Sequence, residues 1–203
     1  LVILDEAQGS SIENGNLVYL LETDFRDVSE MTVMTDANGV RPVAVLTPRQ
    51  ESESGVESDT YTVVGDRIFL LGANYFTASG DVRIEQDSLE AFADSVEYDM
   101  DASGLVLEGD ARVLSGEYDL VGRRITLSAP GAPENRIHAR RNARLEGGDL
   151  LLTSAQIFLF LENDQLERLV ATPVVDPASA VADVEDRERP EAVVENFQLT
   201  ADS

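Results

Sequence analysis

The stretch LVLEGDARVLSGEYDLVGRRITL, residues 105–127, contains the two patterns that decide the fold. Its first half has apolar residues of one parity that alternate with polar ones: Leu105, Leu107, Ala111 and Val113. This period of two is typical of a half-buried β-strand. Ser115-Gly116 follows as a two-residue turn signal, and such turns join antiparallel strands in hairpins. The stretch is therefore predicted to be one hairpin of two strands.

The second strand of this hairpin changes the side on which its apolar residues lie. Gly122 separates the pair Tyr118 and Leu120, of one parity, from the pair Ile125 and Leu127, of the other. A strand with this pattern must bulge or bend at the small residue if both halves are to face one interior. A strand that bends midway can contribute to two facing sheets.

The same bent strand recurs along the chain. Its small residue, followed at +3 by Ile or Val and at +5 by an apolar residue, stands at Gly65, Ala93, Gly122 and Ser154. The period is about 30 residues, which indicates a repeat architecture whose units bury their apolar faces against their neighbours. A second phrase marks the companion strands, at Gly80-Asp81, Gly109-Asp110 and Arg141-Asn142, and Gly80 and Gly109 are the expected flex points of these strands.

The predicted fold class is all-β, with stacked bent antiparallel hairpins that form an open β-jellyroll. Further two-residue turns are expected at Gln86-Asp87, Gly147-Gly148 and Asn163-Asp164. The alternative is a parallel β-helix. Its coils do not reverse at two-residue turns, so the hairpin stack is favoured.

Four segments are distinguished by their patterns. Residues 1–60 contain strand-like runs at 16–21 and 31–35 and an acidic loop, and are predicted to belong to the same body. Residues 61–175 hold the repeats. Residues 176–196 are rich in acid, Pro and Ala, and are predicted to be a loop or insertion. Residues 197–203 resemble the start of another repeat, so the chain is expected to be a fragment of a longer protein.

Composition excludes several classes of function. The 203 residues include 39 acidic and 15 basic side chains, for a net charge of −24, which disfavours electrostatic capture of nucleic acid. Cysteine is absent, so disulfides and thiolate metal sites are excluded. No apolar run is long enough for a transmembrane helix. No metal-binding or cofactor-binding motif is present, and the single histidine, His138, has no nucleophile at a recognisable spacing, so no cofactor and no catalytic residue is assigned.

The repeats resemble a known family. The phrases GDVRIEQDSLEAFADSVEYD (80–99), LEGDARVLSGEYDLVGRRITL (107–127) and RNARLEGGDLLLTSAQIFLF (141–160) are similar to the OstA-type repeat of the LptA, LptC and N-terminal LptD family of periplasmic lipopolysaccharide-transport proteins. The resemblance covers residues 61–172 and returns at 197–203. It implies a bent-strand β-jellyroll in the periplasm, with acyl chains held between its inner walls and protomers or partners of the same fold joined edge to edge.

Two groups of residues are candidates for binding. The first comprises inward positions that could line a lipid groove: Leu105, Leu107, Ala111, Val113, Ile125, Leu127, Ile137, Ala139, Ala143, Leu145, Ile157 and Leu159. An ordinary hydrophobic core has the same composition. The second is a basic cluster that could contact phosphorylated sugar or an acidic partner: Arg123, Arg124, Arg136, Arg140, Arg141 and Arg144.

The outward arginines at one repeat position have a simpler interpretation. Arg83, Arg112 and Arg144 occupy equivalent places, and the predicted hairpin sets Arg112 opposite Asp119 as a surface ion pair.

Three functions remain open. The protein could be a lipid-binding bridge that carries or shields the acyl chains of lipopolysaccharide or a related glycolipid between the inner and outer membranes. It could be a structural scaffold that polymerises through its sheet edges without binding lipid. It could also be a solenoid-type enzyme, which is disfavoured because the inward positions are apolar.

Overall fold

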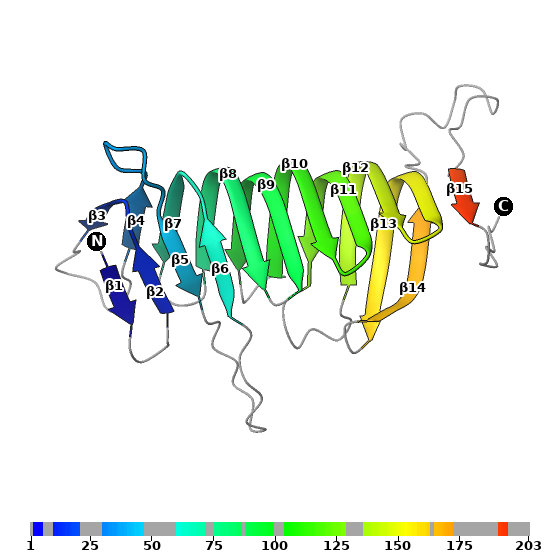
Figure 1. Ribbon diagram of the computed structural model, residues 1–203, viewed down its shortest axis with the longest axis horizontal. Helices are drawn as coiled ribbons and strands as arrows, with labels where there is room; N and C mark the ends of the chain where they lie inside the picture. The colour runs from blue at the N-terminus through cyan, green and yellow to red at the C-terminus, as the bar shows by residue number, and fades with distance from the viewer. Residues whose placement is uncertain are drawn as a thin grey trace.

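The computed structural model describes residues 2–5, 10–20, 30–46, 60–71, 75–86, 88–99, 104–128, 136–162, 165–172 and 191–194. Within these ranges the regular secondary structure consists of β-strands, which all belong to one antiparallel sheet. The strands stack side by side along the long axis of an elongated body, with β1 (Val2–Asp5) near one end and β15 (Glu191–Val194) at the other (Figure 1). The predicted all-β jellyroll is confirmed.

The long strands of the repeat region pair as consecutive antiparallel neighbours. They are β8 (Tyr75–Gln86), β9 (Leu89–Asp99), β10 (Gly104–Ser115), β11 (Tyr118–Leu127), β12 (Arg136–Gly147) and β13 (Leu150–Glu162). A register shift interrupts each pairing midway, as between Glu108 and Ala111 where β10 meets β11. These irregularities bend every long strand, and the sheet folds over onto itself.

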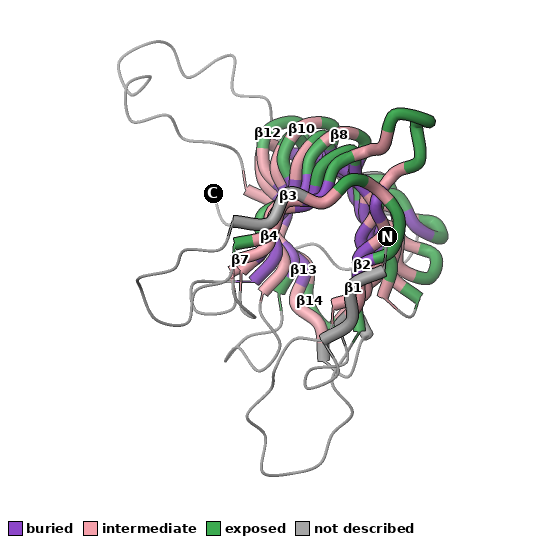
Figure 2. The backbone as a smooth tube through the Cα atoms, turned by 90° about the vertical axis from the view of Figure 1, so that its left-hand side faces the viewer, coloured by how far each residue is buried: buried purple, intermediate pink, exposed green. Residues whose placement is uncertain are grey.

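Folding the sheet creates two facing walls. Wall 1 contains the half-strands next to the two-residue hairpins, together with β1, β2 (Ser10–Glu13), β5 (Val43–Leu46), β6 (Tyr61–Val64) and β15. Wall 2 contains the other half-strands, together with β3 (Asn16–Leu20), β4 (Glu30–Met34), β7 (Arg67–Leu71) and β14 (Gln165–Thr172). Viewed along the body, the buried residues of the two walls face one another (Figure 2).

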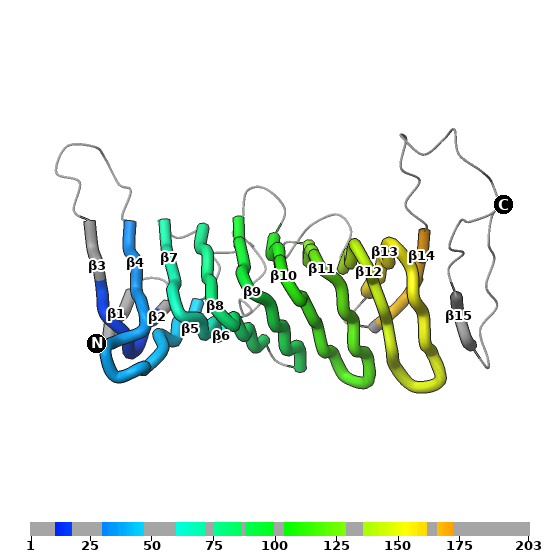
Figure 3. The backbone as a smooth tube through the Cα atoms, turned by 90° about the horizontal axis from the view of Figure 1, so that it is seen from above, coloured from blue at the N-terminus to red at the C-terminus, as the bar shows by residue number. Residues whose placement is uncertain are grey.

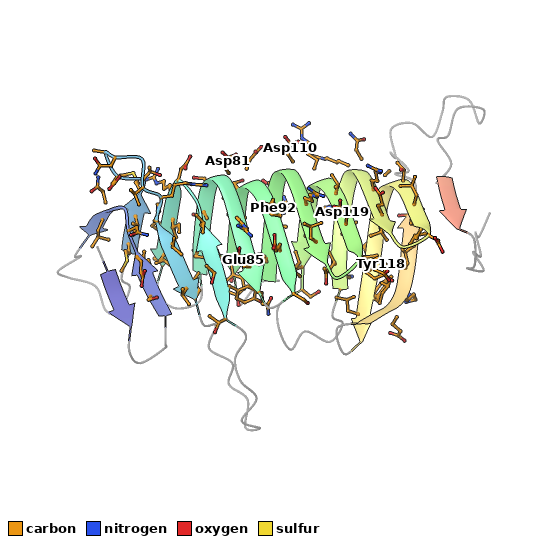
Figure 4. The ribbon with its side chains drawn as sticks, in the orientation of Figure 1. Asp81, Glu85, Phe92, Asp110, Tyr118 and Asp119 are labelled. Carbon is orange, nitrogen blue, oxygen red and sulfur yellow. The ribbon has the colours of Figure 1, made fainter. Side chains whose placement is uncertain are left out.

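The walls meet along a ridge, where the long strands bend in two different ways. On β8, β10 and β12 two successive residues have positive φ, and these pairs are Gly80-Asp81, Gly109-Asp110 and Arg141-Asn142. On β9, β11 and β13 the burial pattern changes parity, as from Gly122 to Ile125. The predicted flex points at Gly80 and Gly109 and the predicted changes of parity are confirmed. The bend at Arg141-Asn142 was not predicted. Asp81 and Asp110 lie along the ridge in Figure 4.

The first of the predicted bent strands, the one around Gly65, is two separate strands in the structure, and the break lies at the ridge. β6 and β7 are separated by Gly65-Asp66, and they pair with opposite halves of β8. The amide of Asp66 donates to the carbonyl of Ser79 at 2.9 Å, and the Arg41 guanidinium lies 2.9 Å from the Asp66 carboxylate. Arg41 also donates to the carbonyl of Asp81 at 2.7 Å, so it holds three segments of the ridge together.

The N-terminal region continues the same body. The strand-like runs at 16–21 and 31–35 form β3 and β4, which are confirmed, while β1, β2 and β5 were not predicted. Seen from above, these strands extend the stack of the repeat region in one direction (Figure 3). β15 lies inside 176–196, a range predicted as loop or insertion, and pairs with Leu150–Thr153 of β13. The acidic loop at 47–59 and the segment 197–203 fall outside the described residues.

The hairpin turns are shifted by one residue from the predicted positions. Ser115 pairs with Tyr118, so the turn is Gly116-Glu117, and Gly147 pairs with Leu150, so the next is Gly148-Asp149. Gln86 pairs with Leu89, so Gln86 belongs to the strand and not to the turn. Gly116 has φ +58°, and the φ of Glu117 is not positive. This combination matches a type II′ turn, which takes glycine at its first central position. The predicted turn at 163–164 lies outside the described residues.

Candidate functional site: the interior and open edge between the walls

The space between the walls is filled by one continuous hydrophobic cluster. It runs from Ile12 and Val33 in the N-terminal strands to Leu159 in β13. Eleven of the groove candidates are buried, with at most 5% exposure: Leu105, Leu107, Ala111, Val113, Ile125, Ile137, Ala139, Ala143, Leu145, Ile157 and Leu159. Leu127 is partly buried and packs against the cluster. All twelve therefore face the interior, as predicted from their parity.

Small inward side chains are found beside the bends of the long strands. Small residues flank the bends, where the walls converge: Ala78, Ala93, Ala111, Ala139 and Ala143. At Gly122 a Cβ atom would lie 3.3 Å from the carbonyl oxygen of Arg140, so little room is left there. Large side chains lie at the same distance from the ridge on neighbouring strands, since Ile125 and Ile157 are both in register with Ala139. Small and large residues therefore fill this part of the interior together.

The edge opposite the ridge, hereafter the open edge, is apolar and partly exposed. The ends of the strands in both walls contribute half-buried side chains that pack against the core: Leu46, Leu89, Tyr118 and Leu150 from wall 1, and Met31, Leu70, Leu127 and Leu161 from wall 2. Burial is thus complete near the ridge and incomplete along this edge. An apolar ligand would meet its first apolar surface there.

Aromatic side chains join the two walls near the middle of the body. Tyr61 of wall 1 and Tyr98 of wall 2 have ring centroids 6.2 Å apart. Phe76, next to Tyr98 in wall 2, stacks on it with centroids 5.2 Å apart. Tyr98 is only 3% exposed, and its hydroxyl has no hydrogen-bond partner among the described residues. Burial, with a smaller contribution from the charge of Asp99, raises the pKa of the Tyr98 hydroxyl.

The sequence analysis did not single out this aromatic contact. Tyr61 stands four residues before Gly65 and Tyr98 five after Ala93, which are ordinary inward positions of the repeat. The signal available in the sequence was the replacement of an aliphatic residue by tyrosine at these two positions. Which tyrosines meet depends on the angle between the walls, and the pattern along one strand carries no information about that angle.

The predicted basic cluster is partly neutralised by acidic residues in the structure. Arg124 pairs with Glu108 and Arg144 with Glu146, so two members are already neutralised by acids. Arg136 and Arg144 lie on opposite sides of the bend in β12. Arg123, Arg140 and Arg141 lie at or beside the bends in β11 and β12, and no carboxylate of a described residue forms an ion pair with any of them. Arg124 lies opposite Arg140 where β11 pairs with β12, so the arginines at the bends are neighbours, with Arg136 and Arg144 on either side of them.

The outward arginines at the repeated position do form surface ion pairs. Arg83 contacts Glu85 and Glu90, and Arg144 contacts Glu146. Arg112 donates two hydrogen bonds to Asp119, at 2.8 and 2.7 Å, although the residue opposite Arg112 is Val121 and the contact is diagonal. The Arg112 guanidinium lowers the pKa of the Asp119 carboxyl. The ion pair is confirmed and the predicted register was wrong, because the turn begins one residue later.

His138 lies on the outer face, where its ring contacts two side chains of the neighbouring strand. Its ring stacks on Phe158 with centroids 3.9 Å apart, and its Nε2 lies 3.0 Å from Oε1 of Gln156. Burial is the main cause that lowers the pKa of His138. Across the part of the chain that the structure describes, no group of three His, Asp or Glu side chains could hold a metal ion. No helix with the length and apolarity needed to cross a membrane occurs in the same residues.

Comparisons with known proteins give one similar fold. No protein-family model matches the chain, and no curated protein matches it. Among solved structures, the chain is similar to LptH of Pseudomonas aeruginosa, described as the LptA-homologous periplasmic component of the conserved lipopolysaccharide transport device. The TM-score is 0.52 at 16% sequence identity, over 67% of this chain and 95% of that chain. This similarity confirms, at the level of the fold, the resemblance to the LptA family.

Proposed function

We propose that this protein is a periplasmic component of lipopolysaccharide transport. In this proposal it holds the acyl chains of lipopolysaccharide, or of a related glycolipid, between its two walls. The observation that carries the proposal is the continuous apolar interior, which extends from the N-terminal strands to β13 and reaches the surface along the open edge. The fold shared with LptH supports it.

The spacing of the strands would let one extended acyl chain contact several of them. Neighbouring strands lie about 4.8 Å apart, so an acyl chain along the body would contact inward residues from several consecutive strands. Such a row is provided on the consecutive strands β10 to β13 by Leu107, Ile125, Ala139 and Ile157, which are in register. Ligand pockets for apolar molecules are lined in this way, with few polar groups. The proposal assigns a binding role only and involves no catalytic step.

Photo-crosslinking at the open edge tests lipid binding. A photoreactive amino acid at Leu127 or Leu150, which are inward and half-buried, is expected to crosslink lipopolysaccharide when the protein is expressed in an envelope that contains it. The neighbouring residues Thr126 and Leu151 have the opposite parity, and Leu151 is 40% exposed. The same probe at these two positions is expected to give no adduct, because its side chain points away from the interior. Adducts are identified by gel shift and lipid A immunodetection.

The control positions make this result interpretable. Each control differs from its test position by one residue, so expression, location and local mobility are matched. Equal crosslinking at all four positions would indicate surface adsorption. Absence of adducts at all four, in protein that is folded and yields no glycolipid on organic extraction and mass spectrometry, would favour the scaffold that binds no lipid.

Both walls end in strands that pair on one side only. Among the described strands, β1 and β3 are the last at one end, and β14 and β15 are the last at the other. Unpaired strand edges form hydrogen bonds with another chain unless they are blocked. As part of the proposed function, the protein joins edge to edge with copies of itself or with proteins of the same fold.

Proline substitutions in β14 test this assembly. Successive amides of a regular strand point to opposite sides, so of Leu169 and Val170, which pair regularly with Leu159 and Phe158, one amide faces β13 and the other faces the free edge. Proline at the outward position is expected to reduce concentration-dependent association, measured by sedimentation, with an unchanged unfolding midpoint. Proline at the inward position is expected to lower the midpoint instead. A protein that stays monomeric at millimolar concentration before any substitution would contradict edge-to-edge self-association.

A further inference from the structure

The Tyr98 hydroxyl is a polar group in an apolar environment. Its ring lies between Phe76 of the same wall and Tyr61 of the opposite wall, and its neighbour across the β9–β10 pair is Leu105, which is 4% exposed. Less than 1 Å² of the hydroxyl oxygen is exposed, and no described residue forms a hydrogen bond with it. Tyr98 is the only tyrosine of the described chain with this environment.

A hydroxyl of this kind destabilises the free protein. A buried donor without an acceptor loses its hydrogen bonds to water and regains none, whereas phenylalanine would fill almost the same volume without that loss. Packing of the aromatic ring therefore explains a phenylalanine at this position as well as it explains a tyrosine. The hydroxyl itself is explained if something that enters the interior accepts its hydrogen bond.

We propose that the Tyr98 hydroxyl donates a hydrogen bond to an ester or amide carbonyl oxygen of the bound acylated lipid, where an acyl chain enters the interior past the Tyr61–Tyr98 contact. This inference rests on the proposed function of the interior. It adds a specific contact that distinguishes an acylated glycolipid from a plain hydrocarbon.

The surroundings favour a neutral acceptor over a phosphate. A charged group beside Phe76, Tyr61 and Leu105 would lose its hydration in an apolar environment, and this costs far more than the transfer of a carbonyl. Asp99 follows Tyr98 directly and would repel an anion. Carbonyl groups stand at the head of each acyl chain, so they would lie near the open edge while the hydrocarbon lies deeper between the walls. Tyr98 lies near that edge, five residues after Ala93 at the ridge.

The test compares Tyr98→Phe with Tyr75→Phe. Both substitutions remove one hydroxyl from the same wall, but the hydroxyl of Tyr75 lies at the surface and donates to the Glu97 carboxylate at 3.1 Å. Two probes are used with each protein. Radiolabelled hexa-acylated lipid A contains ester and amide carbonyls, whereas N-phenyl-1-naphthylamine is an apolar fluorophore without oxygen. Unfolding midpoints are measured in the absence of either probe.

The expected result is selective. Tyr98→Phe should weaken lipid A binding about three- to tenfold, the loss of one net hydrogen bond, and leave binding of the fluorophore unchanged. Its unfolding midpoint should stay the same or rise, because an unsatisfied donor has been removed. Tyr75→Phe should change binding of neither probe.

Each contrary result identifies what has failed. Unchanged lipid A binding by Tyr98→Phe, with clear binding by the unsubstituted protein, would overturn the inference and leave the proposed function intact. A lower midpoint for Tyr98→Phe would show that the hydroxyl is satisfied in the free protein, and would also overturn it. Failure of the unsubstituted protein to bind lipid A would overturn the proposed function and the inference together.

Discussion

Leu127→Asp is expected to abolish binding of lipid A while the protein remains folded. Leu127 lies at the open edge and is only partly buried, so an aspartate there can keep contact with water in the free protein. An acyl chain that enters past this position would cover the carboxylate and remove its hydration, which costs several kcal/mol. We expect at least a hundredfold loss of affinity in a pull-down of labelled lipid A. Removal of the leucine should lower the free energy of unfolding by about 1–2 kcal/mol.

Two neighbouring substitutions separate binding from folding. Thr126→Asp introduces the same charge one residue away on the outer face and should leave lipid binding within about twofold of the original, since no desolvation penalty arises there. Ile125→Asp introduces it at a position that is 0% exposed and should prevent folding. If Leu127→Asp binds lipid A normally, acyl chains do not pass this part of the edge. If Leu127→Asp unfolds as Ile125→Asp does, the open edge excludes water as completely as the interior does.

Gly109→Ala, at the ridge, is expected to cause a large loss of stability. Gly109 has φ +76°, and a Cβ atom built on it would lie 2.8 Å from the Cβ and 2.7 Å from the Cγ of Asp94. The substitution therefore combines backbone strain with a steric overlap that rotation of the Asp94 side chain cannot fully relieve. We expect the free energy of unfolding to fall by about 2–4 kcal/mol in urea denaturation.

The strain and the overlap can be measured separately. Gly116 has φ +58° and no atom within 4 Å of its hypothetical Cβ, so Gly116→Ala should cost only the backbone strain, about 1 kcal/mol. Removing the Asp94 side chain by Asp94→Gly should recover part of the loss in the Gly109→Ala background, because it relieves the overlap alone. Equal losses for Gly109→Ala and Gly116→Ala would show that the ridge tolerates a wider contact between β9 and β10.

The ridge shows how one bend can be made from different residues. Gly80-Asp81 and Gly109-Asp110 follow the same pattern, whereas Arg141-Asn142 adopts positive φ at both positions without glycine. The left-handed conformation costs a residue with a side chain about 1 kcal/mol or more, although asparagine tolerates it better than most. The surrounding pairing of β11, β12 and β13 therefore imposes this bend on residues that do not favour it. A glycine-based signal could not have found it.

The long strands of the repeat region, their antiparallel order and most of their bends could be predicted from the sequence. Alternation is a local property, because residues at every second position of a strand, such as Leu105, Leu107 and Val113, point to the same face. The change of parity at Ala93, Gly122 and Ser154 similarly marks a bend within one strand. The twelve inward candidates could be named for the same reason, since parity decides which face of a strand is buried in a two-walled body.

Which residues meet across the interior and around the bend depends on how the sheet folds over. The contact of Tyr61 with Tyr98, and the unpartnered hydroxyl that results, depend on the angle at which the walls close. The division of the arginines into paired members and the three at the bends depends on the register, which a one-residue shift at Gly116 changes along the whole hairpin. Residues far apart in sequence acquire these partners only when the sheet folds over, and no periodicity along a single strand encodes that step.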